Sequence, residues 1–156
     1  MFVNRIRARA SAILLDGAML AVSGCSPAAP ATDRKPASSS MRPVVVAIGD
    51  PIMKGHGLSA AQAWPVILAA SNNWNPTNLA CDGAGFVAAG DDNDCGDDFS
   101  GLVDEAVVLH PVLIIISGSS NDLGTDNDPL RTETISVVGS LRAKLPTTTI
   151  VGISTV

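Results

Sequence analysis

VVVAIGDPIMKGHGL, residues 44–58, joins a continuous apolar run to a loop that is rich in glycine and polar residues. The run Val44–Ile48 shows no alternation between apolar and polar residues, and most of its side chains are β-branched. Such a run is typical of a strand that is buried on both faces of a parallel sheet. The stretch therefore predicts an α/β domain in which helices cover both sides of a sheet.

The rest of the chain repeats this order of strand and helix. Three short apolar runs predict further strands, at Thr77–Ala80, Val112–Ile116 and Thr149–Thr155. Three stretches with helical spacing predict helices, over Trp64–Ala70, over Leu102–Leu109 and around Ile135, Val138, Leu141 and Leu145. Two polar stretches predict loops, Gly90–Asp98 and Asn121–Asp128.

Four strands that alternate with helices predict a three-layer α/β/α sandwich with a parallel sheet. The sequence stops on the fourth strand, so we expect a sheet that is incomplete at its C-terminal side. This partial domain is assigned to residues 43–156. Sites in such sheets lie at the carboxyl ends of the strands, so the loops after Ile48, Ala80 and Ile116 are the ones that matter for function.

The N-terminal segment is typical of a bacterial export signal. Residues 1–24 combine a basic start with an apolar stretch, and they lead into Cys25 through the small residues Ser23 and Gly24. This ending resembles a lipobox, which predicts an exported lipoprotein anchored to the membrane through lipidated Cys25. An ordinary signal, or a buried helix with an incidental cysteine, is the alternative. Asp16 interrupts the apolar stretch at a cost of roughly 3 kcal/mol, which predicts inefficient export.

Residues 25–42 are rich in proline, alanine and serine and predict a flexible tether. If Cys25 carries lipid, Cys81 and Cys95 remain as a pair, and outside the cytoplasm a disulfide between them is expected. Two free buried thiols are the alternative. The formal net charge of -5 argues against nucleic acid as a partner, because phosphate binding requires cations. The sequence has no CxxC and no nearby pair of histidines, so we expect no metal site and no cofactor.

Three loops, each following a predicted strand, carry a family resemblance. Gly49-Asp50-Pro51, Asp82-Gly83 and Ser119-Ser120-Asn121-Asp122 resemble, in this order, the first three sequence blocks of the SGNH (GDSL-type) hydrolases. The resemblance covers residues 44–156. It implies a flavodoxin-like SGNH hydrolase fold and descent from a secreted carboxylic ester hydrolase, a serine acylhydrolase.

The resemblance also implies roles for individual positions. The family's serine nucleophile corresponds to Pro51, and its oxyanion is held by backbone and side-chain N–H groups that correspond to Gly83 and Asn121. Proline has neither a hydroxyl nor a backbone N–H, so no catalytic residue of this block is intact. The Asp-x-x-His that supplies the family's base does not occur after Asn121. Ser119 replaces the glycine of the third block, although Gly118 lies next to it.

Other residues are weaker candidates for chemistry. His56 is interpreted as a turn histidine rather than a base, and His110 as a structural residue at a helix end. Ser59 and Ser119 have no recognisable base partner. The acidic residues between 91 and 98 do not follow the spacing of a calcium loop, because Cys95 takes a ligand position, so a solvated loop is expected.

The resulting hypothesis is a catalytically silent relative of the SGNH ester hydrolases. One alternative is a non-catalytic module on the same fold, in which Gly83 and Asn121 bind the oxygen of a small ester or an acylated sugar. Another alternative is an enzyme fragment that a second chain completes with the missing Asp-x-x-His.

Overall fold

Residues 41–154 are described by a computed structural model of the chain. The predicted signal peptide of residues 1–24, the predicted lipid anchor Cys25 and nearly all of the tether lie outside the described residues. The same holds for residues 155 and 156, where the last predicted strand was expected to end.

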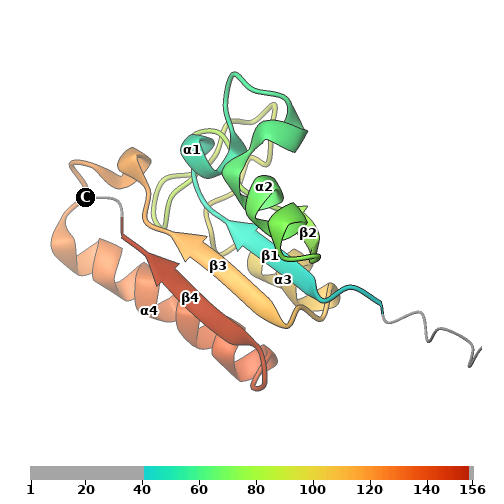
Figure 1. Ribbon diagram of the computed structural model, residues 1–156. Coiled ribbons are helices and arrows are strands. Elements are labelled where there is room, and N and C mark those ends of the chain that lie inside the picture. Colours follow the sequence, from blue (N-terminus) through green and yellow to red (C-terminus); the bar gives the residue numbers. More distant parts are fainter. Residues whose placement is uncertain (1–40, 155–156) are drawn as a thin grey trace, which may run out of the picture. The chain divides into compact units, whose positions relative to one another are not determined.

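The centre of the domain is a four-stranded parallel sheet (Figure 1). Its strands are β1 (Val44–Ile48), β2 (Asn75–Asn78), β3 (Leu113–Ser117) and β4 (Thr149–Ile153). Their order across the sheet is β2-β1-β3-β4, so the first strand lies between the second and third. The loops that follow β1, β2 and β3 therefore emerge side by side at one edge.

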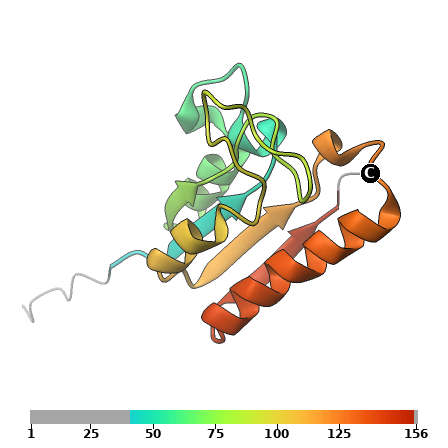
Figure 2. The ribbon, with the colours of Figure 1, turned by 180° about the vertical axis from the view of Figure 1, so that it is seen from behind.

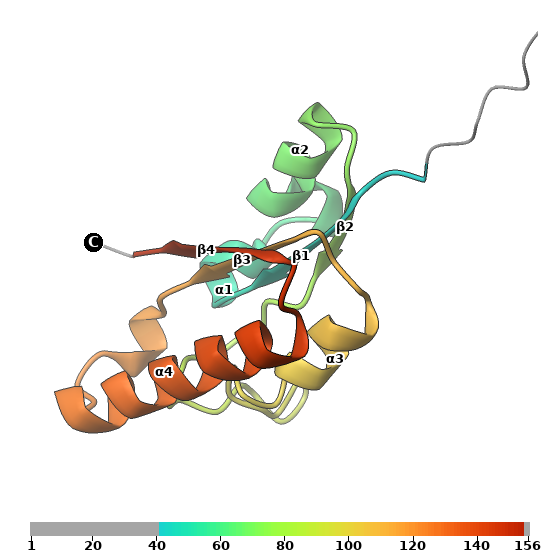
Figure 3. The same ribbon diagram turned by 90° about the horizontal axis from the view of Figure 1, so that it is seen from below.

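Helices cover both faces of this sheet (Figures 2 and 3). The helices are α1 (Pro51–Lys54), α2 (Trp64–Ser71), α3 (Val103–Val108) and α4 (Asn127–Lys144), with short 3-10 turns at Ala60–Gln62 and Ser120–Asp122. Figure 3 shows α2 on one side of the sheet and α3 and α4 on the other. The predicted three-layer α/β/α architecture is confirmed. Within residues 41–154, no helix is both long and apolar enough to span a bilayer.

The alternation of side chains along each strand divides the core into two parts. Val46 and Ile48 of β1 face the larger part, where they pack with Val137 and Leu141 of α4. Val45 and Ala47 face the smaller part, which also contains Met53 of α1, Ile115 of β3 and the partly buried Trp64 of α2. A strand that contributes to both parts needs apolar residues at every position, and the run at 44–48 provides them.

The second strand begins and ends earlier than the sequence predicted. β2 covers Asn75–Asn78 rather than Thr77–Ala80. The N–H of Asn75 donates to Pro43, just before β1, and the N–H of Leu79 donates to Ala47 of β1. Pro76 therefore lies at a position whose backbone N–H would point away from the neighbouring strand. Proline is tolerated there because β2 is the edge strand of the sheet.

The last helix is also longer than predicted, and it presents a different face to the core. α4 begins at Asn127, inside the stretch that the sequence assigned to a polar loop. Val137 and Leu141 are buried, whereas Ile135 is 61% exposed. Of the residues that the sequence assigned to this helix, Leu141 is buried as its spacing suggested, but Ile135 is not. The first buried residue of the helix is Val137 instead. The third strand was predicted one residue too early, because Val112 lies outside β3 and is exposed.

Residues 79–102 connect β2 to α3 without a helix or strand. Aromatic side chains anchor this segment, with Phe86 and Phe99 in edge-to-face contact at a ring separation of 5.0 Å. Both rings belong to the larger part of the core. The segment is therefore a packed part of the domain although it has no regular structure.

Candidate active site

The three loops that the sequence singled out meet at the carboxyl edge of the sheet. The N–H of Cys81 donates to the carbonyl of Gly49 over 3.0 Å, which joins the second loop to the first. The side-chain amide of Asn121 donates to the carbonyl of Ala84 over 2.9 Å, which joins the third loop to the second. The three loops that the sequence predicted to matter for function are therefore in contact with one another.

The first loop turns into α1 through an aspartate and a proline. Asp50 is the N-cap of α1, and its Oδ1 accepts hydrogen bonds from the N–H groups of Ile52 and Met53 at 3.0 and 3.3 Å. Pro51 occupies the first position of the helix, where its fixed φ is favourable and no N–H is required. Asp50 is extended, as expected for a residue before proline, and the turn forms a regular cap. The buried Oδ2 of Asp50 has no hydrogen-bond partner among residues 41–154.

The second loop presents a glycine with an open backbone amide. Gly83 has a φ of 80°, in the region that favours glycine, and an added Cβ would lie 2.9 Å from Oδ1 of Asp91. In the described part of the chain, no acceptor takes the Gly83 N–H. This unpaired N–H stands at the position that the resemblance assigns to an oxyanion donor.

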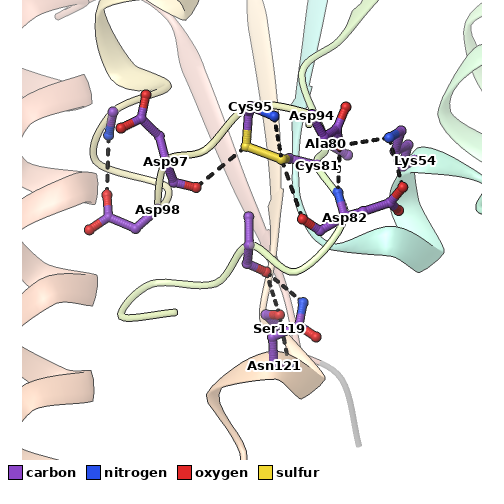
Figure 4. Close-up of a disulfide and its surroundings, with 12 residues drawn as sticks. Lys54, Ala80, Cys81, Asp82, Asp94, Cys95, Asp97, Asp98, Ser119 and Asn121 are labelled. Carbon is purple, nitrogen blue, oxygen red and sulfur yellow. Dashed lines mark hydrogen bonds and ion pairs between the residues drawn. A yellow bond between two sulfur atoms is a disulfide. The ribbon is translucent and has the colours of Figure 1, made fainter. Parts of the chain in front are cut away.

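The third loop is held by its own polar side chains (Figure 4). Ser119 is buried, and its hydroxyl donates to the carbonyl of Ala84 over 2.7 Å while it accepts from the N–H of Asn121 over 3.0 Å. Ser119 therefore organises the loop and offers no free hydroxyl for nucleophilic attack. The Asn121 amide group uses one hydrogen for Ala84, and its second hydrogen remains for another acceptor.

Asp122 fixes the third loop to the segment after β2, a role that the sequence did not reveal. Asp122 is 5% exposed, and its carboxylate accepts hydrogen bonds from three successive N–H groups, those of Phe86, Val87 and Ala88, at 2.7, 3.0 and 3.0 Å. The partners lie 34 to 36 residues away, so no local pattern indicates them.

Lys54 links the first two loops through a pair of carboxylates. Its Nζ lies 2.8 Å from Oδ2 of Asp82 and 2.6 Å from Oδ2 of Asp94. The other carboxylate oxygen of Asp82 lies 3.1 Å from Nδ1 of His56. The hydrogen bonds to Asp82 and Asp94 raise the pKa of Lys54 above 10.5. The hydrogen bond from Lys54 lowers the pKa of both aspartates below 3.8.

Replacing Lys54 by methionine is expected to lower the free energy of unfolding by about 1 kcal/mol at pH 7, because solvent screens a pair that is one third exposed. The depressed carboxylate pKa values stabilise the folded chain above pH 3.8, and this stabilisation is lost as the pH falls through the folded values. The raised lysine pKa adds stability below pH 10.5 that is lost at still higher pH. Urea unfolding of Lys54→Met and the unmutated chain at pH 7 and pH 3 measures the loss at neutral pH and its decrease as the aspartates are protonated. An equal loss at the two pH values would contradict this account.

Cys81 and Cys95 form a disulfide next to this cluster, with their Cα atoms 6.0 Å apart (Figure 4). The acidic stretch that contains Cys95 is a loop, and most of its side chains are exposed. Asp94 is exposed as well, and its carboxylate also pairs with Lys54. No group of three histidine, cysteine or acidic side chains within residues 41–154 is arranged to hold a metal ion.

The remaining polar candidates have local partners. The hydroxyl of Ser59 donates to Gln62 at the start of a 3-10 turn. His110 follows α3 with a φ of 46°, which makes it part of the turn into β3. The hydroxyls of Ser59, Ser71, Ser100 and Ser119 all donate to partners other than an imidazole.

Two hollows lie next to the first loop. The larger, of about 480 Å³, lies over the C-terminal end of α1 and the end of β2, and its polar lining includes Lys54, His56 and Asp82. The smaller, of about 420 Å³, is lined by Pro51, Ile52, Gly55, His56 and Leu58. His56 is common to both, and Gly83 and Asn121 line neither of them.

No family profile and no curated protein matches the sequence. Solved structures do match the fold. A family two carbohydrate esterase from Clostridium thermocellum, in complex with cellohexaose, superposes with a TM-score of 0.57 at 17% identity over 74% of this chain and 43% of its own. AlinE4, an SGNH-hydrolase family esterase, gives 0.55 at 22% identity over 74% of this chain and 60% of its own. TesA superposes with a TM-score of 0.54 at 19% identity, over 70% of this chain and 58% of its own.

The chain has the SGNH-hydrolase fold. It spans between 43% and 60% of the length of these three structures. The residues that the SGNH resemblance singles out all lie at the carboxyl edge of the sheet, where sites occur in such folds: Pro51 begins α1, Gly83 lies in a loop and Asn121 lies in a 3-10 turn.

Proposed function

We propose that the chain is a catalytically silent member of the SGNH ester hydrolases. The observation that carries this proposal is Pro51, which stands at the first position of α1, where the resemblance places the serine nucleophile. Because proline is favourable at this position of a helix, the substitution is accommodated without loss of the surrounding turn. The fold tolerates the change, and only the chemistry is lost.

The physical reason is that one residue removes two functions. Acyl transfer by a serine enzyme needs a hydroxyl that attacks the ester carbonyl and N–H groups that hold the resulting oxyanion. Proline has neither a hydroxyl nor an N–H. The loss of one oxyanion donor alone costs about 3 kcal/mol of transition-state stabilisation, or roughly 100-fold in rate. The open amide of Gly83 and the second amide hydrogen of Asn121 support descent from an ester-binding site.

The purified chain is expected to release no p-nitrophenol from p-nitrophenyl acetate or butyrate above the rate of a blank. The His56→Gln variant is the control, because an exposed imidazole reacts slowly with activated esters by itself. A saturable rate in the unmutated chain that disappears in Ser59→Ala or Ser119→Ala would contradict the proposal. These short acyl esters represent the substrate class of the ancestor, which we propose to be small esters or acylated sugars.

A further inference from the structure

His56 is held in a defined orientation by a fixed carboxylate. Its Nδ1 lies 3.1 Å from Oδ1 of Asp82, and Asp82 is in turn held by Lys54, whose Nζ lies 2.8 Å from the other carboxylate oxygen. A carboxylate only accepts hydrogen bonds, so in the neutral imidazole the proton resides on Nδ1 and Nε2 is left as an acceptor. The imidazole is 70% exposed, so a substrate can reach it. A base oriented by a carboxylate is the arrangement that activates a hydroxyl nucleophile.

The turn at the end of α1 brings His56 next to residue 51. Gly55 has a φ of 82°, and the N–H groups of Gly55 and His56 both donate to the carbonyl of Pro51, at 3.0 and 2.9 Å. In helix ends of this kind, the side chains at these two positions commonly contact each other. Pro51 and His56 also line the same hollow of about 420 Å³, together with the exposed apolar side chains of Ile52 and Leu58.

We infer that Asp82 and His56 form a general-base pair directed at position 51, and that Ile52 and Leu58 receive the acyl chain of a small ester. This inference rests on the proposed function, because it adds a base to a site whose nucleophile is absent. With a serine at position 51, the hydroxyl oxygen forms a bond to the ester carbonyl carbon while its proton passes to Nε2 of His56. The tetrahedral adduct then breaks the bond to the alcohol, which leaves with that proton. A water molecule then passes a proton to the same Nε2 while its oxygen bonds to the acyl carbon. The bond between that carbon and the hydroxyl oxygen of residue 51 breaks, and Nε2 returns the proton to this oxygen as the carboxylic acid leaves.

The Pro51→Ser variant tests the inference. We expect it to hydrolyse p-nitrophenyl butyrate at least roughly 100-fold faster than Pro51→Ser/His56→Gln, which is the lower range for a positioned base. Pro51→Ser/His110→Gln is the matched control, and it is expected to hydrolyse the ester as fast as Pro51→Ser. Intact-mass analysis is expected to detect a butyryl adduct in the single variant and none in Pro51→Ala. A folded Pro51→Ser variant with no turnover above Pro51→Ala would overturn the inference and leave the proposed function in place.

Asp82 acts through His56 and is a positioning residue. In the Pro51→Ser background, Asp82→Asn is expected to lower kcat about tenfold and to leave KM unchanged, whereas general damage to the fold would raise KM as well. A measurement on the unmutated chain is independent of whether the variants fold. Nitrogen NMR of the two histidines is expected to show His56 with its proton on Nδ1 at neutral pH. A proton found mainly on Nε2 would overturn the inference.

Discussion

Replacing Asp122 by alanine is expected to lower the free energy of unfolding by about 4 kcal/mol, because three backbone N–H groups lose their acceptor at once. The Phe86 N–H is buried, and water does not replace the lost carboxylate there without opening the loop. The same carboxylate joins the loop after β3 to the segment after β2. Its removal is therefore expected to loosen both segments together.

Urea unfolding followed by the fluorescence of Trp64 and Trp74 measures this loss. Asp92→Ala is the matched control, because this aspartate is exposed and its side chain makes no hydrogen bond within residues 41–154. It is expected to change the stability by less than about 0.5 kcal/mol. Gly85→Ala examines the same contact from the other side, since an added Cβ would overlap the Asp122 carboxylate. An Asp122→Ala variant within 1 kcal/mol of the unmutated chain would refute this role.

The parts of the fold that the sequence predicted are those encoded by local patterns. The run at 44–48 is apolar at every position because it contacts both parts of the core, and that pattern is visible without a structure. The loops that carry Pro51, Gly83 and Asn121 follow from the same reasoning, since parallel strands deliver their carboxyl ends to one edge. The boundaries of β2 were predicted wrongly because proline is unusual inside a strand, so Pro76 was not assigned to one.

The parts that the sequence did not predict depend on partners far apart in the chain. His56 lies in a turn, as the sequence predicted, but its contact with Asp82, which lies 26 positions away, was not predicted. Lys54 and Asp94 are 40 positions apart. Charged residues also occur on protein surfaces where they form no pair, so the sequence alone does not indicate which of them interact. The pairs can be identified only once the positions of the loops at the edge of the sheet are known. One local clue existed, because Asp82 directly precedes the glycine that the resemblance singled out.

The segment of residues 79–102 has no helix or strand to hold it, so its order depends on a few strong constraints. The disulfide between Cys81 and Cys95 is one of them. Removing it by the double substitution Cys81→Ala/Cys95→Ala is expected to lower the free energy of unfolding by about 3 kcal/mol, the value for closing a loop of roughly 15 residues. Two alanines avoid the burial of an unpaired hydroxyl at the position of Cys81, which is 1% exposed.

The disulfide also fits against a glycine, so the bond and its surroundings can be tested separately. An added Cβ at Gly90 would lie 2.6 Å from both sulfur atoms, and Gly90→Ala is expected to destabilise the oxidised chain. In the double-alanine background, where both sulfurs are gone, the same substitution is expected to cost much less. Urea unfolding of the four chains, all carrying Cys25→Ser to prevent thiol exchange, measures this coupling. Equal costs of Gly90→Ala with and without the disulfide would show that the bond does not pack against this glycine in solution.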